Sequence, residues 1–299
     1  MNDDSGASLF ENERARLVGL AYRLLGSVSD AEDVVQEAWF RWSSADQALI
    51  ERPAAWLTTV VSRLGLDRLR AQRRARVDYV GPWLPEPLIE PFDRDQPERA
   101  AVLADSLTTA FLVMLDRLAP EERLVLLLVD VFGESFRTAA ASVGRSEDAT
   151  RQLAVRARRK LRDLGEQPAS AHLASNELLA IATQFVGAVL AGDVMQVRSL
   201  LTDDVVLVSD GGKDRHAARR PVVGRDRVAR FVVNLGKRLQ DPSDAELVWV
   251  NGSPGFLLRS DGVPSMVVSV DLDHGRISRY WSFLNPDKLA TIEHQPHVM

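Results

Sequence analysis

The sequence contains no cysteine, so neither a disulfide nor a thiolate metal site can form. Histidine is scarce: there are five, and four of them stand in expected loops or tails. The longest apolar run, residues 124–132, is interrupted by Asp130 and is too short to span a bilayer. Residues 1–8 are polar and lack the apolar core of a signal peptide. We therefore expect no metal, no cofactor and no membrane partner, and a cytoplasmic location.

The sequence also lacks an excess of positive charge. Its 37 basic and 42 acidic residues give a formal net charge of −5 at pH 7. Any surface that binds nucleic acid must therefore be local. With 45% hydrophobic and 26% charged residues the composition is that of an ordinary globular protein, and 299 residues allow about two or three domains.

Positive charge is concentrated in residues 135–162. Ser135 is suited to cap a short helix, Gly144 to end it in a left-handed turn, and Ser146 to cap a second helix. Between residues 151 and 162 the second helix carries six cationic side chains and no acid: Arg151, Arg156, Arg158, Arg159, Lys160 and Arg162. This is a helix-turn-helix pattern, whose second helix enters the major groove of DNA. The alternative is a solvated basic helix that binds nothing.

An acidic helix is expected earlier in the chain, where Ser29 and Glu32 form a capping box. Residues 30–37 contain four acids and no base. One face of the helix is polar and acidic, and it consists of Asp33, Gln36, Glu37 and Phe40. Such a run is usually a solvated face, and the alternative is a docking surface for a basic partner.

The next expected helix begins at Pro53, a residue that favours the first helical position. One of its faces combines an aromatic ring, a hydroxyl and two arginines: Trp56, Thr59, Arg63 and Arg70. Six arginines against one aspartate give residues 63–76 a net charge of +5. Single-stranded nucleic acid needs rings for base stacking and guanidinium groups for its backbone. A core role for Trp56 with solvated arginines is equally open.

The remaining chain divides into a linker, more helices and a strand-rich region. Five prolines between residues 79 and 97 indicate an extended linker. Helices are expected over residues 101–118 and 121–131. After a helix that ends near residue 192, strand-like runs follow at residues 205–209, 245–250, 256–259, 266–271 and 276–284. A helix over residues 225–239 interrupts them, which makes this region α+β.

The two helical modules resemble the two-domain core of bacterial extracytoplasmic-function sigma factors. Three segments carry the resemblance, which covers roughly residues 10–165. Residues 31–39 read Ala-Glu-Asp-Val-Val-Gln-Glu-Ala-Trp, like the polymerase-docking helix of the family. Residues 53–57, Pro-Ala-Ala-Trp-Leu, continue to Arg70 like its −10 element helix. Residues 151–158 resemble its −35 reading helix.

The resemblance implies a role for each segment. The acidic helix would bind the coiled coil of the β′ subunit of core RNA polymerase through Asp30, Asp33, Gln36, Glu37 and Trp39. Residues 43–52 and the next helix would hold the melted −10 element through Trp56, Thr59, Arg63 and Arg70. The −35 element would be read by Glu147, Asp148, Arg151 and Gln152, with phosphates bound by Arg156 and Arg158.

The C-terminal third resembles the SnoaL-like branch of the nuclear-transport-factor-2 (NTF2) fold, a cone with an internal pocket. Sigma factors of the SigJ type carry such a domain, and three short signatures support this subgroup: Trp83-Leu84-Pro85-Glu86-Pro87, Asp210-Gly211-Gly212-Lys213 and Asn285-Pro286-Asp287-Lys288-Leu289. The second has one glycine fewer than the subgroup's pattern. By the resemblance the domain regulates promoter binding in cis. We also expect residues 285–289 to latch onto the first domain or onto the linker at Trp83.

The expected protein is multidomain: two all-α sigma domains followed by an α+β cone. Its parts are a sigma-2 domain (residues 9–78), a proline-rich linker (79–100), a sigma-4 helix-turn-helix domain (101–166) and a SnoaL-like regulatory domain (175–290). We expect a promoter-specificity subunit of RNA polymerase that is not an enzyme. The C-terminal cavity leaves room for an unidentified small-molecule ligand.

Two alternative functions stay open. One is a ligand-sensing helix-turn-helix regulator that acts without polymerase. The other is a SnoaL-like enzyme with a DNA-binding attachment, which would use Asp210 as a general base. Against the enzyme, an aspartate before glycine more often shapes a turn.

Overall fold

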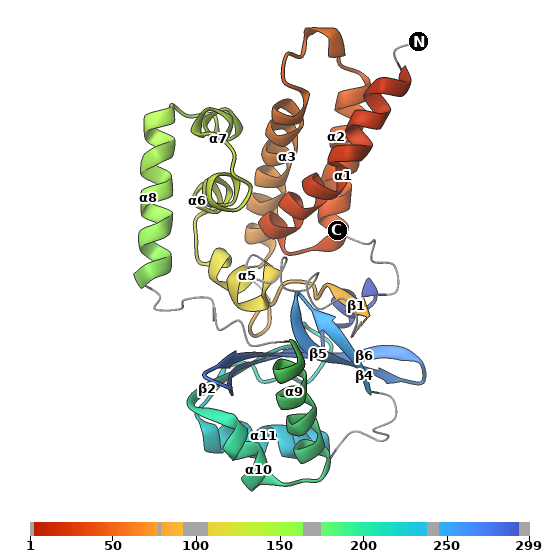
Figure 1. Cartoon of the computed structure of the whole chain (residues 1–299), viewed down its shortest axis with the longest axis vertical. Helices are drawn as coiled ribbons and strands as arrows, with labels where there is room; N and C mark the ends of the chain where they lie inside the picture. Colours follow the sequence, from red (N-terminus) through yellow and green to blue (C-terminus); the bar gives the residue numbers. More distant parts are fainter. Residues whose placement is uncertain (1–2, 77–78, 92–106, 164–174, 238–244, 293–299) are drawn as a thin grey trace. The chain divides into compact units, whose positions relative to one another are not determined.

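The computed structural model describes residues 3–76, 79–91, 107–163, 175–237 and 245–292. These residues form two compact units. The first unit contains residues up to 78 together with residues 112–166, and the second contains residues 79–111 together with residues 167–294. Figure 1 labels their elements. Among the described helices, none combines the length and the apolar character that crossing a membrane requires.

Three helices form the first half of the first unit: α1 (Asp3–Leu25), α2 (Val28–Ser43) and α3 (Pro53–Ala75). A short 3-10 helix, Gln47–Leu49, lies between α2 and α3. The core of this half is buried almost completely, and it includes Leu17, Tyr22, Trp42, Leu57 and Leu69. The predicted capping box at Ser29 is wrong. The N-cap is Ser27, whose hydroxyl accepts the Asp30 N–H at 3.2 Å, and α2 begins at Val28.

The second half of the first unit contains the predicted helix-turn-helix. Its elements are α5 (Thr109–Asp116), α6 (Pro120–Leu126), a π-helical segment (Leu127–Val131), α7 (Phe136–Val143) and α8 (Glu147–Asp163). The Ser135 hydroxyl accepts the Thr138 N–H at 3.2 Å, and Gly144 is left-handed at φ 67°. The Ser146 hydroxyl accepts the Ala149 N–H at 3.2 Å. Both predicted caps and the predicted turn are thus confirmed.

The second unit is built on a sheet of seven described strands in the order β1-β4-β5-β6-β7-β2-β3. Their bounds are Ile89–Pro91, Leu201–Asp210, Val222–Val223, Ala245–Val250, Ser253–Ser260, Val263–Asp273 and Arg276–Phe283 for β1 to β7. Only β2 and β7 pair in parallel among them. Figure 1 shows α9 (Ser175–Leu190), α10 (Val194–Leu200) and α11 (Arg225–Gly236) on one face of the sheet. The predicted α+β fold is confirmed.

The sheet includes part of the predicted linker. Residues 89–91 form β1, which pairs antiparallel with β4 at one edge of the sheet. An edge strand tolerates Pro91 because one side of it needs no ladder hydrogen bonds. Ahead of β1, the Leu88 N–H donates to the Asn251 side-chain oxygen at 2.7 Å and the Asn251 N–H donates to the Leu88 carbonyl at 2.9 Å. Residues 92–100 of the predicted linker lie outside the described residues.

Candidate functional site

The acidic helix α2 presents an exposed surface of three polar residues and one ring, which we call the α2 surface: Asp33, Gln36, Glu37 and Phe40. The Phe40 side chain is 60% exposed, which is unusual for a large apolar residue. Trp39, also predicted to bind polymerase, instead packs edge-on against Phe10, with ring centroids 4.9 Å apart. Glu37 accepts a hydrogen bond from Arg41 at 2.6 Å. The helix thus offers negative charge beside an exposed aromatic ring.

Asp30 was predicted to belong to this surface, but it joins α2 to α3. Its carboxylate accepts hydrogen bonds from Arg68, whose Nε is 2.7 Å away, and from Gln72. The hydrogen bond to Asp30 raises the pKa of the Arg68 guanidinium. Asp30 is therefore committed to packing within the first unit.

The arginines of the predicted α3 face contact the helix-turn-helix half of the same unit. Trp56 is half-buried beside Trp42, with ring centroids 5.6 Å apart, and Thr59 is half-buried as well. Arg63 donates to the Ala141 carbonyl oxygen at 2.8 Å. Arg70 donates to Glu121 at 3.0 Å. The two arginines that were predicted to bind a melted strand are thus held by the chain itself.

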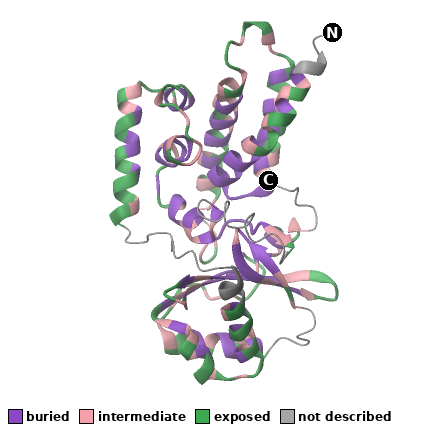
Figure 2. Ribbon diagram, viewed as in Figure 1, coloured by how far each residue is buried: buried purple, intermediate pink, exposed green. Residues whose placement is uncertain are grey.

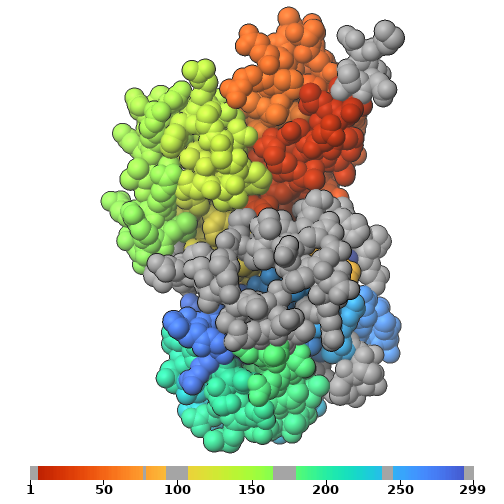
Figure 3. Space-filling view, viewed as in Figure 1, coloured from red at the N-terminus to blue at the C-terminus, as the bar shows by residue number. Residues whose placement is uncertain are grey.

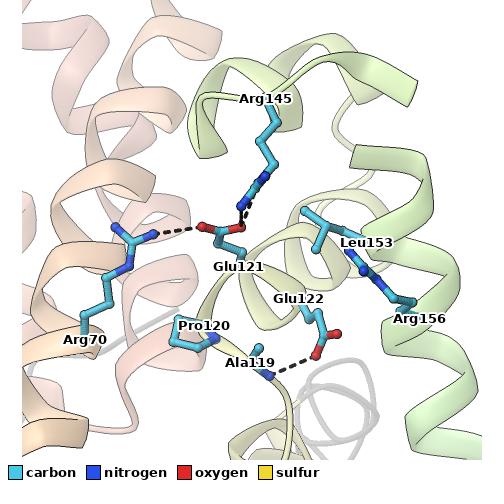
Figure 4. Close-up of a pocket in the computed structure, with 8 residues that line it drawn as sticks. All are labelled: Arg70, Ala119, Pro120, Glu121, Glu122, Arg145, Leu153 and Arg156. Carbon is cyan, nitrogen blue, oxygen red and sulfur yellow. Dashed lines mark hydrogen bonds and ion pairs between the residues drawn. The ribbon is translucent and has the colours of Figure 1, made fainter. Parts of the chain in front are cut away.

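Glu121 lies between two arginines from different halves of the unit. Figure 4 shows its carboxylate bridging Arg70 on α3 and Arg145 in the helix-turn-helix, at 3.0 and 2.8 Å. The bridge stands in a pocket of about 460 Å³, which is lined by Arg70, Ala119, Pro120, Glu121, Glu122, Arg145, Leu153 and Arg156. Because the acid and both bases meet in a hollow, they are partly shielded from solvent. We call this bridge the Glu121 clamp.

Two further acids of the second half contact bases of the first half. Asp116 lies 3.1 Å from Arg76 and 3.3 Å from Arg123. Glu134 accepts from Arg16 at 3.2 Å. Acids of the second half are therefore matched to bases of the first, and the two halves form a closed arrangement.

Arg123 is a buried cation that the sequence analysis did not single out. Its side chain is 0% exposed and donates to the Arg23 carbonyl oxygen at 2.8 and 3.2 Å. Burial lowers the pKa of Arg123 to about 9 and that of Arg23 to about 10. Both guanidinium groups stay charged at neutral pH. The sequence did contain a signal for this burial, because Arg123 stands at the start of a helical run that is apolar from Leu124 to Val129.

The outer face of α8 is open to solvent, as predicted for a helix that reads DNA. Arg151, Gln152 and Arg156 are exposed, and Figure 2 shows this face in green. In the space-filling view α8 forms part of the visible surface of its unit (Figure 3). Asp148 is exposed and Glu147 half-buried, and both accept weak hydrogen bonds from Arg151, at 3.4 and 3.3 Å. These residues present both donors and acceptors to a partner.

Arg158, predicted to bind a phosphate, is engaged within the unit. It donates to Asp130 at 2.9 Å through Nε and at 2.5 Å through a terminal nitrogen. The hydrogen bond to Asp130 raises the pKa of the Arg158 guanidinium. The pair is partly exposed.

The three short signatures meet in the second unit. Asp210, the last residue of β2, is 0% exposed and accepts from Lys288 at 2.6 Å, from the Leu84 N–H at 2.8 Å and from the Tyr79 hydroxyl at 2.5 Å. Lys288, on α12 (Pro286–Leu289), also donates to the Leu84 carbonyl oxygen. Its ammonium lies 4.4 Å from the centre of the Trp83 ring. We call these five residues the linker latch.

Neighbouring signature residues support the linker latch. The Asn285 side chain donates to the Tyr79 hydroxyl at 2.9 Å and caps α12. Among the other signature residues, Lys213 and Asp287 are exposed and Pro286 is half-buried. The rest are buried: Pro85, Glu86, Pro87, Gly211, Gly212 and Leu289. The expected contact between residues 285–289 and the linker at Trp83 is confirmed.

Asp210 has more partners than the predicted turn requires. It does accept the Gly212 N–H at 3.1 Å, which is a turn contact. Its other hydrogen bonds, however, fix the linker and Lys288. A general base needs a free oxygen that faces its substrate, and both oxygens of Asp210 are engaged. The geometry does not favour catalysis at this residue.

The interior of the sheet leaves little space. An apolar cavity of about 50 Å³ lies between α9 and the strands, bordered by Phe185, Val189, Phe256, Met266 and Tyr280. Burial raises the pKa of the Tyr280 hydroxyl. Ligand pockets are usually about 300–1,000 Å³ in volume, so this cavity is too small for an ordinary metabolite.

The comparisons with known proteins agree with this architecture. Residues 9–75 match the Sigma-70 region 2 family and residues 108–161 the Sigma-70 region 4 family. The chain is 40% identical to "ECF RNA polymerase sigma factor SigJ" of Mycobacterium tuberculosis, over 95% of this chain and 93% of that protein. It is 29% identical to "Probable ECF RNA polymerase sigma factor SigI" of the same species, over 96% and 95%. The crystal structure of SigJ superposes with a TM-score of 0.76 at 38% identity, covering 95% of this chain and 98% of that one.

Proposed function

The chain belongs to the extracytoplasmic-function family of RNA polymerase sigma factors, and on this premise we propose which of its surfaces meet the polymerase and the promoter. The α2 surface binds the coiled coil of the β′ subunit of core polymerase, in the cytoplasm. Its exposure, with two carboxylates beside Phe40, is the observation that supports this assignment. Asp30 and Trp39 position α2 from behind and do not touch the partner.

Two helices of the same unit, α8 and α3, bind different elements of the promoter DNA. The exposed residues of α8 read the −35 element in the major groove, with Arg156 and, once it leaves Asp130, Arg158 on phosphates. On α3, Trp56 and Thr59 with Arg63 and Arg70 hold the melted −10 strand. In-vitro transcription with purified core polymerase on genomic fragments tests the whole assignment. Specific transcripts that depend on this protein are expected, and their absence would contradict it.

Arg151→Ala is expected to weaken binding to a −35 duplex and to relax its sequence preference. A bidentate contact to a base edge contributes about 1–3 kcal/mol of discrimination. Arg151 is exposed near the start of α8, where a recognition helix meets the bases. The control is Arg159→Ala, which removes the same charge farther along α8. Fluorescence anisotropy on matched and mismatched duplexes measures the difference. Equal losses from the two variants would exclude a base-reading role for Arg151.

Promoter binding requires the closed arrangement to open. Arg63 and Arg70 cannot grip a DNA strand while they donate to Ala141 and Glu121. Because the Glu121 clamp places a carboxylate where an arginine would otherwise bind a phosphate, it competes directly with DNA. We propose that free protein is held in the closed arrangement and that polymerase with promoter DNA displaces it.

Glu121→Gln is expected to strengthen the binding of free protein to single-stranded −10 DNA about two- to fivefold. The substitution removes the charge that holds Arg70 and Arg145, and partly exposed pairs of this kind contribute about 0.2–1 kcal/mol each. Asp67→Asn is the control, because it removes the other acid near Arg70, 3.3 Å away, without touching Arg145. If both variants gain affinity equally, the effect is general electrostatics and not release of the clamp.

The C-terminal unit acts on the linker in cis. The linker latch fixes residues 79–84 on the second unit, and β1 extends the hold to residue 91. The length of chain left between the two DNA-reading halves is thereby set by the C-terminal unit. We propose this as the physical basis of regulation, and we place the small-molecule ligand of this unit outside the nearly filled interior of the sheet.

A further inference from the structure

A second hollow in the C-terminal unit is larger than the interior cavity and differs from it in chemistry. It has a volume of about 200 Å³ and is formed by the loop after Asp210 and by the linker at Val80 and Gly81. Three cations line it, namely Lys213, Arg215 and Arg219, against one acid, Asp214, and His216 lines it as well. We call this hollow the basic pocket.

The cations of the basic pocket have no partners among the described residues. Neither Lys213, Arg215 nor Arg219 forms an ion pair there, whereas other cations of the chain are matched to acids, such as Arg68 to Asp30 and Lys288 to Asp210. Three unpaired positive charges around one concavity repel each other. A bound anion would relieve that repulsion, because it accepts hydrogen bonds from several cations at once.

The loop that carries these cations is held in place by the linker latch. Gly212 is left-handed at φ 59°, and a Cβ there would lie 2.8 Å from the Asn285 side chain. A Cβ on Gly211 would lie 2.6 Å from the Arg215 carbonyl oxygen. The Gly212 N–H donates to Asp210, and the Arg215 N–H donates to the Gly211 carbonyl oxygen at 3.2 Å. The backbone of the pocket is therefore fixed before any ligand arrives, which reduces the entropic cost of binding.

We propose that the basic pocket binds a small phosphate monoester. A volume of about 200 Å³ accommodates a phosphoryl group with a short organic part and is too small for a large cofactor. Arginine and lysine are the side chains that bind phosphate, and the His216 ring offers a further N–H donor. Lys213, Arg215 and Arg219 are exposed, and together with the linker they surround a hollow that suits a small anion, whose oxygens several cations can contact at once.

Occupancy of the basic pocket is coupled to the linker. Gly81 lies against Arg219, since a Cβ on Gly81 would be 3.6 Å from the Arg219 Cα. Asp210 contacts both the loop and the linker. A bound phosphate monoester therefore stabilises the loop, the linker latch and the hold on residues 79–84 together. This consequence rests on the proposed regulatory role of the C-terminal unit, whereas the binding itself does not.

Calorimetric titration of the full-length protein tests the site. The probes are glycerol 3-phosphate, inorganic phosphate and neutral glycerol. Saturable binding of glycerol 3-phosphate with one site per chain is expected, tighter than that of inorganic phosphate, with no binding of glycerol. The double variant Lys213→Gln with Arg215→Gln should bind glycerol 3-phosphate at least tenfold more weakly. Arg227→Gln with Arg230→Gln, which removes two exposed charges from α11, should leave this binding unchanged.

Two results would overturn the proposal: the absence of saturable binding at millimolar glycerol 3-phosphate, and equal weakening of that binding in both double variants. If, in the first case, the pocket variant also loses affinity for a non-promoter duplex, the cations are assigned to DNA. Circular dichroism of each variant confirms that it is folded. Because the titration contains neither polymerase nor promoter, its failure would leave the sigma-factor assignment intact.

Discussion

Lys288→Met is expected to destabilise the C-terminal unit by about 3–5 kcal/mol, the cost of removing one partner from a buried ion pair. Methionine has a similar length, but it cannot donate to Asp210 or to the Leu84 carbonyl oxygen. The Asp210 carboxylate, which is 0% exposed, would then be left without its counter-charge. Chemical denaturation followed by tryptophan fluorescence measures the change, and Trp83 reports on the linker latch because the Lys288 ammonium lies over its ring.

A second substitution separates charge from packing. Adding Asp210→Asn to Lys288→Met removes the stranded charge, and the asparagine oxygen still accepts one of the hydrogen bonds from Leu84, Tyr79 or Gly212. Most of the lost stability should return. Asp203→Asn, which breaks the pair between the exposed Asp203 and the half-buried Arg225, is the control and should cost no more than about 1 kcal/mol. A Lys288→Met protein as stable as this control would show that the linker latch contributes little to folding.

Replacing both Asp33 and Glu37 by lysine is expected to abolish binding to core RNA polymerase, with a loss of at least a hundredfold in affinity. The change turns two negative charges into two positive ones on an exposed helix face. Like charges brought together at an interface cost several kcal/mol, and tenfold corresponds to about 1.4 kcal/mol. Neither residue is buried, so the fold should be unaffected. Titration of labelled core polymerase measures the affinity.

The control for this experiment makes the same change elsewhere in the first unit. Glu11→Lys with Asp67→Lys also reverses two exposed acids, and these residues lie outside the α2 surface. Its polymerase binding should stay within about threefold of the original, since separated surface charges are screened by salt. Should the Asp33 and Glu37 variant bind core polymerase normally, the α2 surface would not be the docking site. Failure of the unaltered protein to bind would favour a helix-turn-helix regulator that acts without polymerase.

The parts of the fold that were predicted correctly depend on near neighbours in the sequence. Ser135, Gly144 and Ser146 each make their defining contact within five residues, so the helix-turn-helix could be located from local chemistry. The cap of α2 was misplaced because Ser27 and Ser29 are both capable of capping, and only packing selects the first. Local chemistry thus finds helices reliably and their first residue less so.

The parts that were missed depend on residues far apart. Leu88 pairs with Asn251 across 163 residues, and Tyr79 donates to Asp210 across 131, so neither β1 nor the role of Asp210 could be read from spacing. The hydrogen bond from Arg68 to Asp30 also joins residues that are far apart in the sequence. An acidic residue on a helix face is predicted as exposed unless the partner helix is known. The candidate residues were identified from the sequence, but which of them are already engaged was not.

The buried guanidinium of Arg123 limits how firmly the two halves of the first unit can hold each other. Its normal water shell has been stripped away, and the Arg23 carbonyl oxygen and the 3.3 Å contact with Asp116 replace only part of it. When the halves part, water returns to this group and its rehydration offsets some of the contacts that are lost. A partner that binds the opened arrangement only modestly more tightly than the closed arrangement then suffices to shift the populations of the two.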